Sequence, residues 1–378
     1  MRVVLDATAI PADRGGVGRY VDELLPALAR AGLDLVVVAQ VRDAELLADA
    51  VPSAEVVLAP SRVASRAVRL TWEQTRLPAL VRAVRGDVLH SPHYTMPRRA
   101  GVPVVVTLHD ATFFSDPELH SPVKSRFFRG ATRVAVRQAG ALVVPSAATG
   151  AEVRRFVGGD ESLFHVAYHG VDTATFHPVD EAERGRVAAS LGLEGRPYVA
   201  FLGTLEPRKN VPALVRGWVR AVADRPEPPA LVLAGGRGWD DEVDPAVAAV
   251  PGHLTVVRPG YLPFGDLAGF LAGAVAVAYP SLGEGFGLPV LEAMACGAPV
   301  LTTRRLSLPE VGGDAVAYCE PDDASIGAEL AALLDDADRR ARLSLDATAR
   351  AAGFTWDASA AVHVAAYEAA ARRTRAAG

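Results

Sequence analysis

Two glutamates, Glu284 and Glu292, lie where their carboxylates could hold one small polar ligand. Glu284 is part of a glycine-rich stretch that follows an apolar run ending near Tyr279. Pro289 suits the first turn of a helix, where its missing N–H costs nothing, so Glu292 would lie about one turn inside that helix. Both carboxylates can accept hydrogen bonds from ligand hydroxyls. An ordinary strand–loop–helix connection with one capping glutamate is the alternative.

The backbone between the two glutamates offers a second kind of ligand contact. The amides of Phe286, Gly287 and Leu288 are expected at the N-terminus of the predicted helix, and Gly297 suits its exit. Amides at a helix N-terminus attract anions, because their N–H groups point outward and the helix dipole favours negative charge. We therefore expect this loop to bind phosphate or sugar oxygens.

Two adjacent cations, Arg208 and Lys209, follow an apolar run at 198–202. Arginine offers a planar fork of donors and lysine a point charge, and both suit a pyrophosphate. Asn210 is expected to cap the helix that begins at Val211. A solvated surface pair with no ligand is the alternative.

The first half of the chain carries a glycine turn, Gly15 and Gly16, between an apolar run and a helical stretch. It superficially matches the dinucleotide fingerprint, but Val21 stands where the third glycine of that pattern would be. A nicotinamide cofactor is therefore disfavoured. Either a plain tight turn or a close backbone approach to a ligand explains the glycines.

A histidine, His109, ends another buried run, with Asp110 beside it. A functional role is favoured for His109, and Asp110 would orient either that imidazole or a second substrate. His93 and Tyr94 follow the preceding run and are expected on the side of the second substrate, where His90 and His93 are weaker candidates than His109.

Short apolar runs alternate with helical stretches along the chain, which predicts parallel sheets covered on both faces. The pattern restarts after residues 173–197, so we expect two doubly wound α/β domains at 1–178 and 179–355, and a helix at 356–378 that packs back on the first domain. In such sheets ligands bind beyond the carboxyl ends of the strands. The runs lie at 3–5, 35–38, 56–58, 88–89, 104–106, 142–144, 198–202, 231–233, 254–257, 275–278 and 300–302.

The composition and net charge of the chain limit the kinds of partner and the location that we expect for it. The net charge of −5 does not favour a nucleic-acid binder, and two cysteines, Cys296 and Cys319, give neither a disulfide framework nor metal-ligand spacing. The opening strand leaves no room for a signal peptide and no apolar stretch is long enough to span a bilayer, so we expect a cytoplasmic protein. The basic segment 122–139, which contains Phe127 and Phe128, is interpreted first as a core-facing amphipathic helix with a solvated basic side. Peripheral contact with the inner membrane face is the alternative.

The stretch from Glu284 to Glu292 resembles the E-x7-E element of retaining glycosyltransferases with two Rossmann-like domains facing across a cleft, the GT-B fold, and especially of glycosyltransferase family 4. The resemblance runs through nearly the whole chain. The segments 72–78, 89–94 and 107–110 resemble bacterial mannosyl- or rhamnosyltransferases of polysaccharide and secondary-metabolite assembly.

This resemblance implies roles for the residues above. Glu292 would hold the donor ribose and Glu284 the hydroxyls of the transferred sugar. His109 would lie near the reaction centre, and Gly15 and Gly16 near the donor phosphate. Tyr261 and Leu262 would meet the nucleobase. The family commonly has a diphosphate-clamping arginine where this chain has Thr204, which puts the role of Arg208 in doubt and leaves Lys209 as the safer candidate.

The implied reaction moves a hexose, with mannose favoured and GDP-mannose the leading donor, to a hydroxyl of a saccharide, glycolipid or natural-product acceptor. Anomeric configuration would be retained, and no cofactor would be needed. No metal is expected either, because the acidic residues Asp240, Asp241 and Asp244 resemble an exposed loop more than a metal site. The alternatives are a sugar phosphorylase or nucleotide-sugar epimerase on the same fold, a nicotinamide-dependent oxidoreductase, and a non-catalytic partner that only binds sugar nucleotides.

Overall fold

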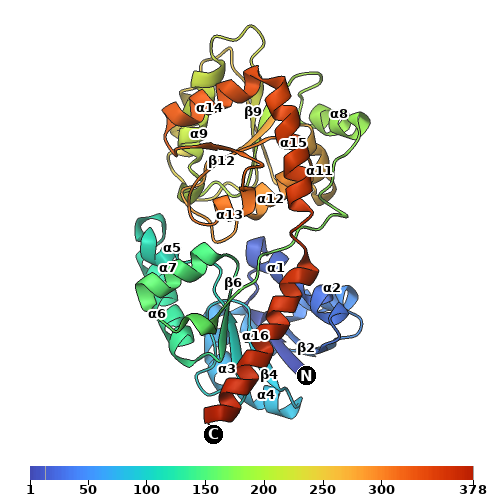
Figure 1. Ribbon diagram of the computed structural model, residues 1–378, viewed down its shortest axis with the longest axis vertical. Helices are drawn as coiled ribbons and strands as arrows, with labels where there is room; N and C mark the ends of the chain where they lie inside the picture. The colour runs from blue at the N-terminus through green and yellow to red at the C-terminus, as the bar shows by residue number, and fades with distance from the viewer. Residues whose placement is uncertain (13, 378) are drawn as a thin grey trace. The chain divides into compact units, whose positions relative to one another are not determined.

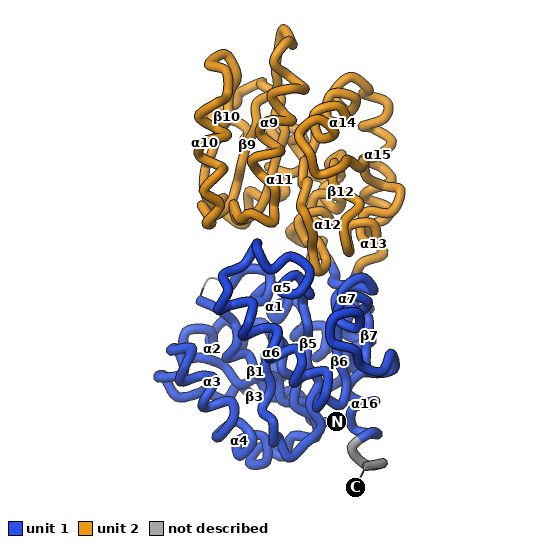
Figure 2. The backbone as a smooth tube through the Cα atoms, turned by 90° about the vertical axis from the view of Figure 1, so that its left-hand side faces the viewer, with its two compact units in different colours: residues 1–170, 355–378 blue, residues 171–354 orange. Residues whose placement is uncertain are grey.

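The computed structural model describes residues 1–12 and 14–377, and the chain forms two compact units (Figures 1 and 2). Unit 1 contains residues 1–170 together with 355–378, and unit 2 contains residues 171–354. The sequence predicts the boundaries at 178 and 355, and the compact units divide after 170 and 354. The chain therefore leaves unit 1, builds unit 2 and returns to unit 1 for its last helix.

Unit 1 is built on a seven-stranded sheet of order β3-β2-β1-β4-β5-β6-β7, and every neighbouring pair is parallel. The short edge strand β7 was not expected from the sequence. The strands are β1 (Arg2–Asp6), β2 (Asp34–Ala39), β3 (Glu55–Leu58), β4 (Val88–Ser91), β5 (Val104–Thr107), β6 (Ala141–Val144) and β7 (Phe164–Val166).

Helices cover both faces of this sheet because successive strand residues point to opposite sides. Val3 and Leu5 of β1 pack against α1, α2 and α16, whereas Val4 between them packs against α3, α4, α6 and α7. The helices of unit 1 are α1 (Gly15–Arg30), α2 (Ala44–Ala50), α3 (Arg66–Thr75), α4 (Leu77–Ala83), α5 (Thr112–Ser115), α6 (Pro122–Gln138), α7 (Ala147–Val157) and α16 (Trp356–Ala377), with short 3-10 turns η1 (Ala7–Ala9), η2 (Val41–Asp43), η3 (Ser61–Ala64), η4 (Pro117–Leu119) and η5 (Glu161–Leu163).

Unit 2 has a six-stranded parallel sheet of order β10-β9-β8-β11-β12-β13. Its strands are β8 (Tyr198–Leu202), β9 (Ala230–Ala234), β10 (Val256–Gly260), β11 (Ala276–Tyr279), β12 (Val300–Thr303) and β13 (Ala317–Cys319). Its helices are α8 (Glu181–Ser190), α9 (Val211–Val222), α10 (Val243–Ala248), α11 (Leu267–Ala272), α12 (Leu288–Ala295), α13 (Leu308–Gly312), α14 (Asp323–Asp335) and α15 (Ala337–Ala351), with turns η6 (Pro207–Lys209) and η7 (Phe264–Asp266).

Each sheet has one place where the strand order reverses. In unit 1 this switch point lies between β1 and β4, and in unit 2 it lies between β8 and β11. Loops that leave the carboxyl ends of the two central strands diverge there, and ligands of doubly wound sheets bind in the resulting crevice. Gly15 and Gly16 open α1, the helix that follows the loop after β1. The loop after β8 carries Arg208 and Lys209, and the loop after β11 carries Glu284.

A chain of buried polar side chains joins α16 to the sheet of unit 1. The Tyr20 hydroxyl lies 2.7 Å from Nε2 of His363 and 2.9 Å from Oγ1 of Thr107. Nε2 of His90 lies 2.9 Å from the same threonine oxygen, and its Nδ1 lies 2.9 Å from the Tyr367 hydroxyl. All five side chains are buried. Their hydrogen bonds therefore replace those to water and fix the position of α16.

We expect a fall in pH to weaken the contact between α16 and the sheet of unit 1. Burial lowers the pKa of His363 from 6.5 to about 4. The unfolded chain therefore takes up the proton first as the pH falls. The stability that the neutral imidazole contributes is complete above pH 6.5 and is lost as the pH falls towards 4. We expect this residue alone to lower the free energy of unfolding by roughly 3 kcal/mol over that range.

Urea unfolding at a series of pH values tests this. The variant His363→Asn should have a flatter pH dependence than the unsubstituted protein. The exposed His253 of unit 2 provides the matched control, since His253→Asn should leave the pH dependence unchanged. Equal curves for the unsubstituted protein and His363→Asn would contradict the assignment.

Candidate functional site in unit 2

The loops after β8 and β11 meet through a buried lysine and a buried glutamate. Nζ of Lys209 lies 2.6 Å from Oε1 of Glu284, and both residues are buried. The Tyr279 hydroxyl donates to the same oxygen at 2.9 Å and also contacts Nζ of Lys209. Oγ of Ser281 donates to it at 2.8 Å. The strand order explains this meeting, because β8 and β11 are neighbours on either side of the switch point.

Arg208 completes the charge balance of this cluster. Its guanidinium pairs with Oε2 of Glu284, donates to the carbonyl of Gly283 at 2.6 Å and donates to Oε1 of Glu206 at 2.7 Å. The side chain is only 16% exposed, so it does not point into solvent. Two cations, Arg208 and Lys209, therefore face two carboxylates, Glu206 and Glu284, in a cluster with no net formal charge.

The charges set the protonation states. Burial acts to raise the pKa of Glu284, but the adjacent Arg208 and Lys209 outweigh it and hold that pKa at about 2. Burial and the neighbouring Arg208 lower the pKa of Lys209 from its ordinary value. Burial and Glu284 raise the pKa of the Tyr279 hydroxyl well above its usual range. At neutral pH Glu284 is thus a carboxylate that can accept hydrogen bonds but cannot serve as a proton donor.

The neighbouring strand and helix hold the Glu284 loop in place. Oγ1 of Thr303, at the end of β12, donates to the carbonyl of Ser281 at 2.7 Å. Oγ of Ser307 lies 2.8 Å from the carbonyl oxygen of Glu284 and 2.7 Å from that of Phe286. These bonds satisfy buried carbonyls that the glycine-rich loop cannot pair within itself. The carboxylate is therefore presented by a loop whose backbone is fixed at several points.

The expected capping role of Asn210 is wrong. Asn210 has a left-handed backbone with φ of 58°, and its side chain makes no capping bond to α9. Its amide instead donates to the carbonyl of Pro321 at 2.7 Å and to that of Pro280 at 3.2 Å. The side chain prefers these carbonyls because the loops after β11 and β13 pass directly beside it, and it joins both to the loop after β8.

Glu292 and the amides before it lie where the sequence predicts. Glu292 is buried in α12, with 1% of its surface exposed. The helix begins at Leu288, Gly287 precedes it with φ of 106°, and no side chain caps it. Phe286 is buried just before this turn. Only a short glycine-rich loop therefore separates Glu284 from the N-terminus of α12.

Tyr261 and Leu262 follow β10 at the same edge of the sheet. Tyr261 is 68% exposed, and its hydroxyl lies so close to Gly236 that a Cβ there would come within 2.6 Å of it. Gly236 belongs to the loop after β9, so the tyrosine ring covers that loop. An aromatic ring that stays exposed at the carboxyl edge can stack on a planar ligand.

In unit 1, the predicted glycines open α1. Gly15 has φ of 47°, and a Cβ added at Gly15 or Gly16 would meet nothing within 4 Å. Packing inside the protein therefore does not require glycine at either position. A left-handed backbone favours glycine at Gly15, but Gly16 has no such requirement.

The predicted histidines of unit 1 form an aromatic cluster. Nε2 of His109 donates to the carbonyl of Pro92 at 2.7 Å, so in the neutral ring Nδ1 is the acceptor. Pro92, rather than Asp110, thus orients the ring. The rings of His93 and Tyr94 lie 5.9 and 6.0 Å from that of His109. Burial lowers the pKa of His109, and that of His93 more strongly, so both are neutral at pH 7.

Asp110 has a local structural role in unit 1. Its carboxylate accepts hydrogen bonds from the amide of Thr112 at 3.1 Å and from Oγ1 of Thr112 at 2.8 Å. Its own amide donates to the Tyr94 hydroxyl at 2.9 Å. These bonds connect the loops after β4 and β5.

The predicted site residues thus form two groups. Unit 2 brings together Arg208, Lys209 and Glu284, with Glu292 and the 286–288 turn following along the chain. Unit 1 gathers His93, Tyr94, His109 and Asp110. Sequence reasoning missed Glu206, Tyr279 and Ser281 as partners of the charged cluster. The position of Tyr279 at the end of a central strand was the available signal for the last two.

Within residues 1–12 and 14–377 no group of His, Cys, Asp or Glu side chains is arranged to hold a metal ion. Asp244 instead pairs with Arg258 at 2.5 Å and Arg237 at 3.3 Å. No helix of the described chain is both long and apolar enough to cross a membrane.

The two parallel doubly wound units form the GT-B fold, which solved glycosyltransferase structures share. The family model described as Glycosyltransferase Family 4 matches residues 14–175, and that described as Glycosyl transferases group 1 matches residues 196–336. The chain belongs to glycosyltransferase family 4.

Named relatives span nearly the whole chain. The O-antigen chain mannosyltransferase B of Escherichia coli is 28% identical over 379 residues, covering 94% of this chain and 97% of that one. The D-inositol 3-phosphate glycosyltransferase of Jonesia denitrificans is 30% identical over 398 residues, covering 94% and 91%. The crystal structure of HepE from Anabaena in complex with UDP and glucose covers 100% of both chains at 19% identity, with a TM-score of 0.74.

A double-mutant cycle on Glu284 and Lys209 tests the charged cluster. Glu284→Gln leaves two buried cations facing a single carboxylate and should lower the free energy of unfolding by about 3 kcal/mol. Adding Lys209→Met should recover part of this loss, with a coupling energy of at least ~1 kcal/mol. The exposed pair Arg154 and Glu161 of unit 1 is the control and should couple by less than ~0.5 kcal/mol. Additive effects at Glu284 and Lys209, measured by urea unfolding, would contradict the structure.

Proposed function

We propose that the protein transfers a hexose, mannose in the first instance, from a nucleoside-diphosphate sugar to a hydroxyl group with retention of anomeric configuration. One observation carries this proposal. The loops after β8 and β11 place a buried carboxylate, Glu284, against two cations, Arg208 and Lys209. A nucleotide sugar carries both groups that such a cluster can bind. Its anionic diphosphate suits the two cations, and the hydroxyls of its neutral polyol suit the carboxylate.

Binding of the donor would exchange partners within the cluster. Arg208 and Lys209 would turn from the carboxylates to the diphosphate, which offers them charge-assisted hydrogen bonds. Glu284 would then accept hydrogen bonds from the hydroxyls of the sugar. Before the donor binds, Arg208 and Lys209 hold the pKa of Glu284 at about 2, so it enters the reaction as a carboxylate. A carboxylate favours the positive charge that develops on the sugar ring as the leaving group departs.

The departing diphosphate gains negative charge in the transition state. Lys209 and Arg208 would stabilise that charge, together with the amides at 286–288 before α12. Glu292, buried one turn into the helix, would accept the hydroxyls of the donor ribose. The Tyr261 ring and the backbone near Leu262 would lie against the base, and Gly15 and Gly16 would allow close approach of the donor phosphate.

No side chain of the cluster is placed as the attacking nucleophile in this proposal. A donor phosphate oxygen accepts the proton of the acceptor hydroxyl, and attack occurs on the face that the leaving group vacates. His109 contributes as a neutral acceptor through Nδ1, since its Nε2 is committed to Pro92. His93, Tyr94 and Asp110 are proposed to lie on the acceptor side.

The similarity to a mannosyltransferase supports mannose as the sugar and GDP-mannose as the leading donor. HepE was solved with UDP and glucose, which makes UDP-sugars the main competitors. The proposed acceptor is a saccharide, a glycolipid or a natural product. A cytoplasmic location, with peripheral contact at the inner membrane face, stays a prediction.

Donor identity and stereochemistry are tested together. GDP-, UDP- and dTDP-sugars are screened by thermal shift, and the best donor is incubated with a panel of acceptors while proton NMR follows the anomeric signal. We expect the largest stabilisation by GDP-mannose and an α-linked initial product. A β-linked initial product from an α-linked donor would exclude retention, and stabilisation only by UDP-sugars would exclude GDP-mannose.

The ribose contact has its own test. Glu292→Ala removes the carboxylate proposed to accept two hydroxyls, so nucleotide affinity should fall by about 2 kcal/mol, close to thirtyfold. Glu194 is exposed in the same unit, and Glu194→Ala should leave affinity unchanged. Calorimetric titration with GDP measures both. An unchanged dissociation constant for a folded Glu292→Ala protein would refute the assignment.

A further inference from the structure

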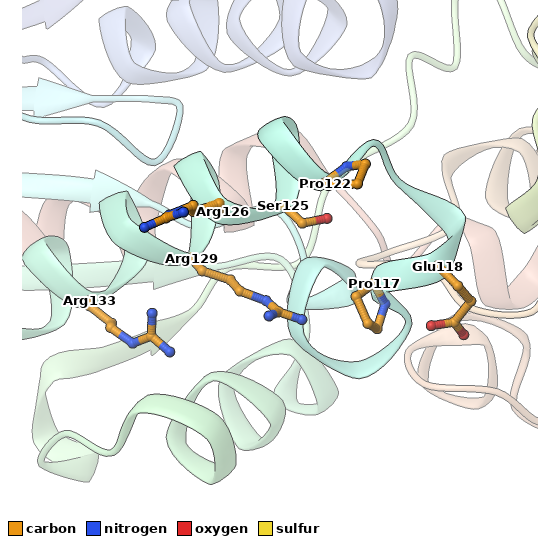
Figure 3. Close-up of a pocket in the computed structure, with 7 residues that line it drawn as sticks. All are labelled: Pro117, Glu118, Pro122, Ser125, Arg126, Arg129 and Arg133. Carbon is orange, nitrogen blue, oxygen red and sulfur yellow. The ribbon is translucent and has the colours of Figure 1, made fainter.

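A surface cavity of about 470 Å³ lies in unit 1 between α6 and the turn η4 that precedes it (Figure 3). Its volume falls within the range of small-ligand sites, about 300 to 1,000 Å³. No part of the proposed donor site belongs to it. The residues that line it are Pro117, Glu118, Pro122, Ser125, Arg126, Arg129 and Arg133.

Three of the lining residues are arginines on one face of α6. Arg126, Arg129 and Arg133 are spaced three and four residues apart, the spacing at which helical side chains become neighbours. Like charges at this spacing destabilise a helix. Among the described residues none of the three forms an ion pair, and the nearby Glu152 of α7 is paired with Arg155 at 3.3 Å. The repulsion is thus not relieved within the protein.

Two of these arginines are held in place by unit 1 itself. Nε of Arg129 donates to the carbonyl of Phe113 at 2.6 Å, and its guanidinium lies 5.6 Å from the centre of the Phe114 ring. The guanidinium of Arg133 lies 5.4 Å from the same ring, which stacks on Phe156 of α7. Figure 3 shows Arg129 extending from the helix towards the turn that carries Pro117. Guanidinium groups held in this way lose less conformational entropy when an anion binds.

A serine adds a neutral hydrogen-bonding group. Ser125 is only 5% exposed, it lines the cavity, and its Oγ has no hydrogen-bond partner among the residues that the structure describes. A buried hydroxyl without a protein partner is uncommon, and a ligand that enters the cavity can supply one. Glu118 is the only acidic residue of the lining.

We propose that this cavity binds the phosphate ester of a polyol. Arg126, Arg129 and Arg133 would hold the phosphate, because guanidinium groups match the geometry of phosphate oxygens. The hydroxyl of Ser125 would donate to the same group. Glu118 would accept hydrogen bonds from the hydroxyls of the polyol, and the two prolines would pack against its C–H groups.

The phosphate ester is either a soluble sugar phosphate or the headgroup of a lipid, since both present the same chemistry. If the ester belongs to the acceptor, this inference rests on the proposed glycosyl transfer. Binding itself does not depend on that transfer, so it is measured without any donor present.

Calorimetric titration with glucose 6-phosphate, inorganic phosphate and glucose tests the soluble arm. We expect glucose 6-phosphate to bind most tightly, inorganic phosphate more weakly and glucose not at all. Flotation with phosphatidylinositol, phosphatidylglycerol and phosphatidylcholine vesicles tests the lipid arm. Preferential binding of either glucose 6-phosphate or phosphatidylinositol supports the site and shows whether its phosphate ester is soluble or belongs to a lipid. No binding in both arms overturns it.

Matched variants on α6 distinguish binding in the cavity from non-specific attraction to the positive charge of the surface. Arg126→Gln and Arg133→Gln should each weaken binding by about tenfold, which corresponds to the loss of one charge-assisted hydrogen bond. Arg137 is an exposed arginine on the same helix that does not line the cavity, and Arg137→Gln removes the same charge. It should change affinity less than about twofold. An equal loss in Arg137→Gln would overturn the proposal.

Glu118→Gln tests recognition of the polyol. It should leave the affinity for inorganic phosphate equal or higher while reducing the preference for glucose 6-phosphate over inorganic phosphate. An unaltered preference would overturn the role of Glu118. GDP affinity, measured in the same variants, should stay at the value of the unsubstituted protein. If none of GDP, UDP and dTDP binds the unsubstituted protein, the proposed transfer fails while the phosphate-ester site still stands on its own titrations.

Discussion

One buried carboxylate determines how the carboxyl edge of unit 2 is built. Glu284 lies away from water, and a buried charge is tolerated only where other charges and hydrogen bonds compensate it. Arg208 and Lys209 arrive from one central strand, whereas Tyr279 and Ser281 arrive from the other. Each cation in turn is tolerated because the carboxylate is present. The two strands cannot therefore be placed independently of the loops that follow them.

The loops around this cluster interlock tightly. Gly238 has φ of 62°, and a Cβ there would come within 1.9 Å of the carbonyl oxygen of Leu205. Gly235 approaches the carbonyl of Gly203 in the same way. The loop after β9 thus rests directly on the loop that carries Arg208 and Lys209. Backbone contacts of this kind fix the path of the loop that carries Arg208 and Lys209.

The sequence predicted the central strands of both sheets, because β-branched runs buried on both faces have no polar interruption. It missed β7 and β13, which are short edge strands with little apolar signal. The positions of Glu284 and Glu292 followed from the glycine and proline spacing around them. The capping role of Asn210 failed because its partners, the carbonyls of Pro280 and Pro321, come from loops far along the chain. Glu284, which compensates Arg208 and Lys209, has the same non-local origin, whereas Glu206 lies only two residues before Arg208.

The return of the chain to unit 1 has a consequence for biosynthesis. Unit 2 is one continuous segment, 171–354, and among the residues that the structure describes its core contains none from outside that range. Unit 1 lacks part of its core until Trp356, Ala360 and Tyr367 of α16 have left the ribosome. The segment made second can therefore complete its fold first. Until α16 has been synthesised, the β-sheet face that it covers, with His90 and Thr107 on it, remains open to chaperones and proteases.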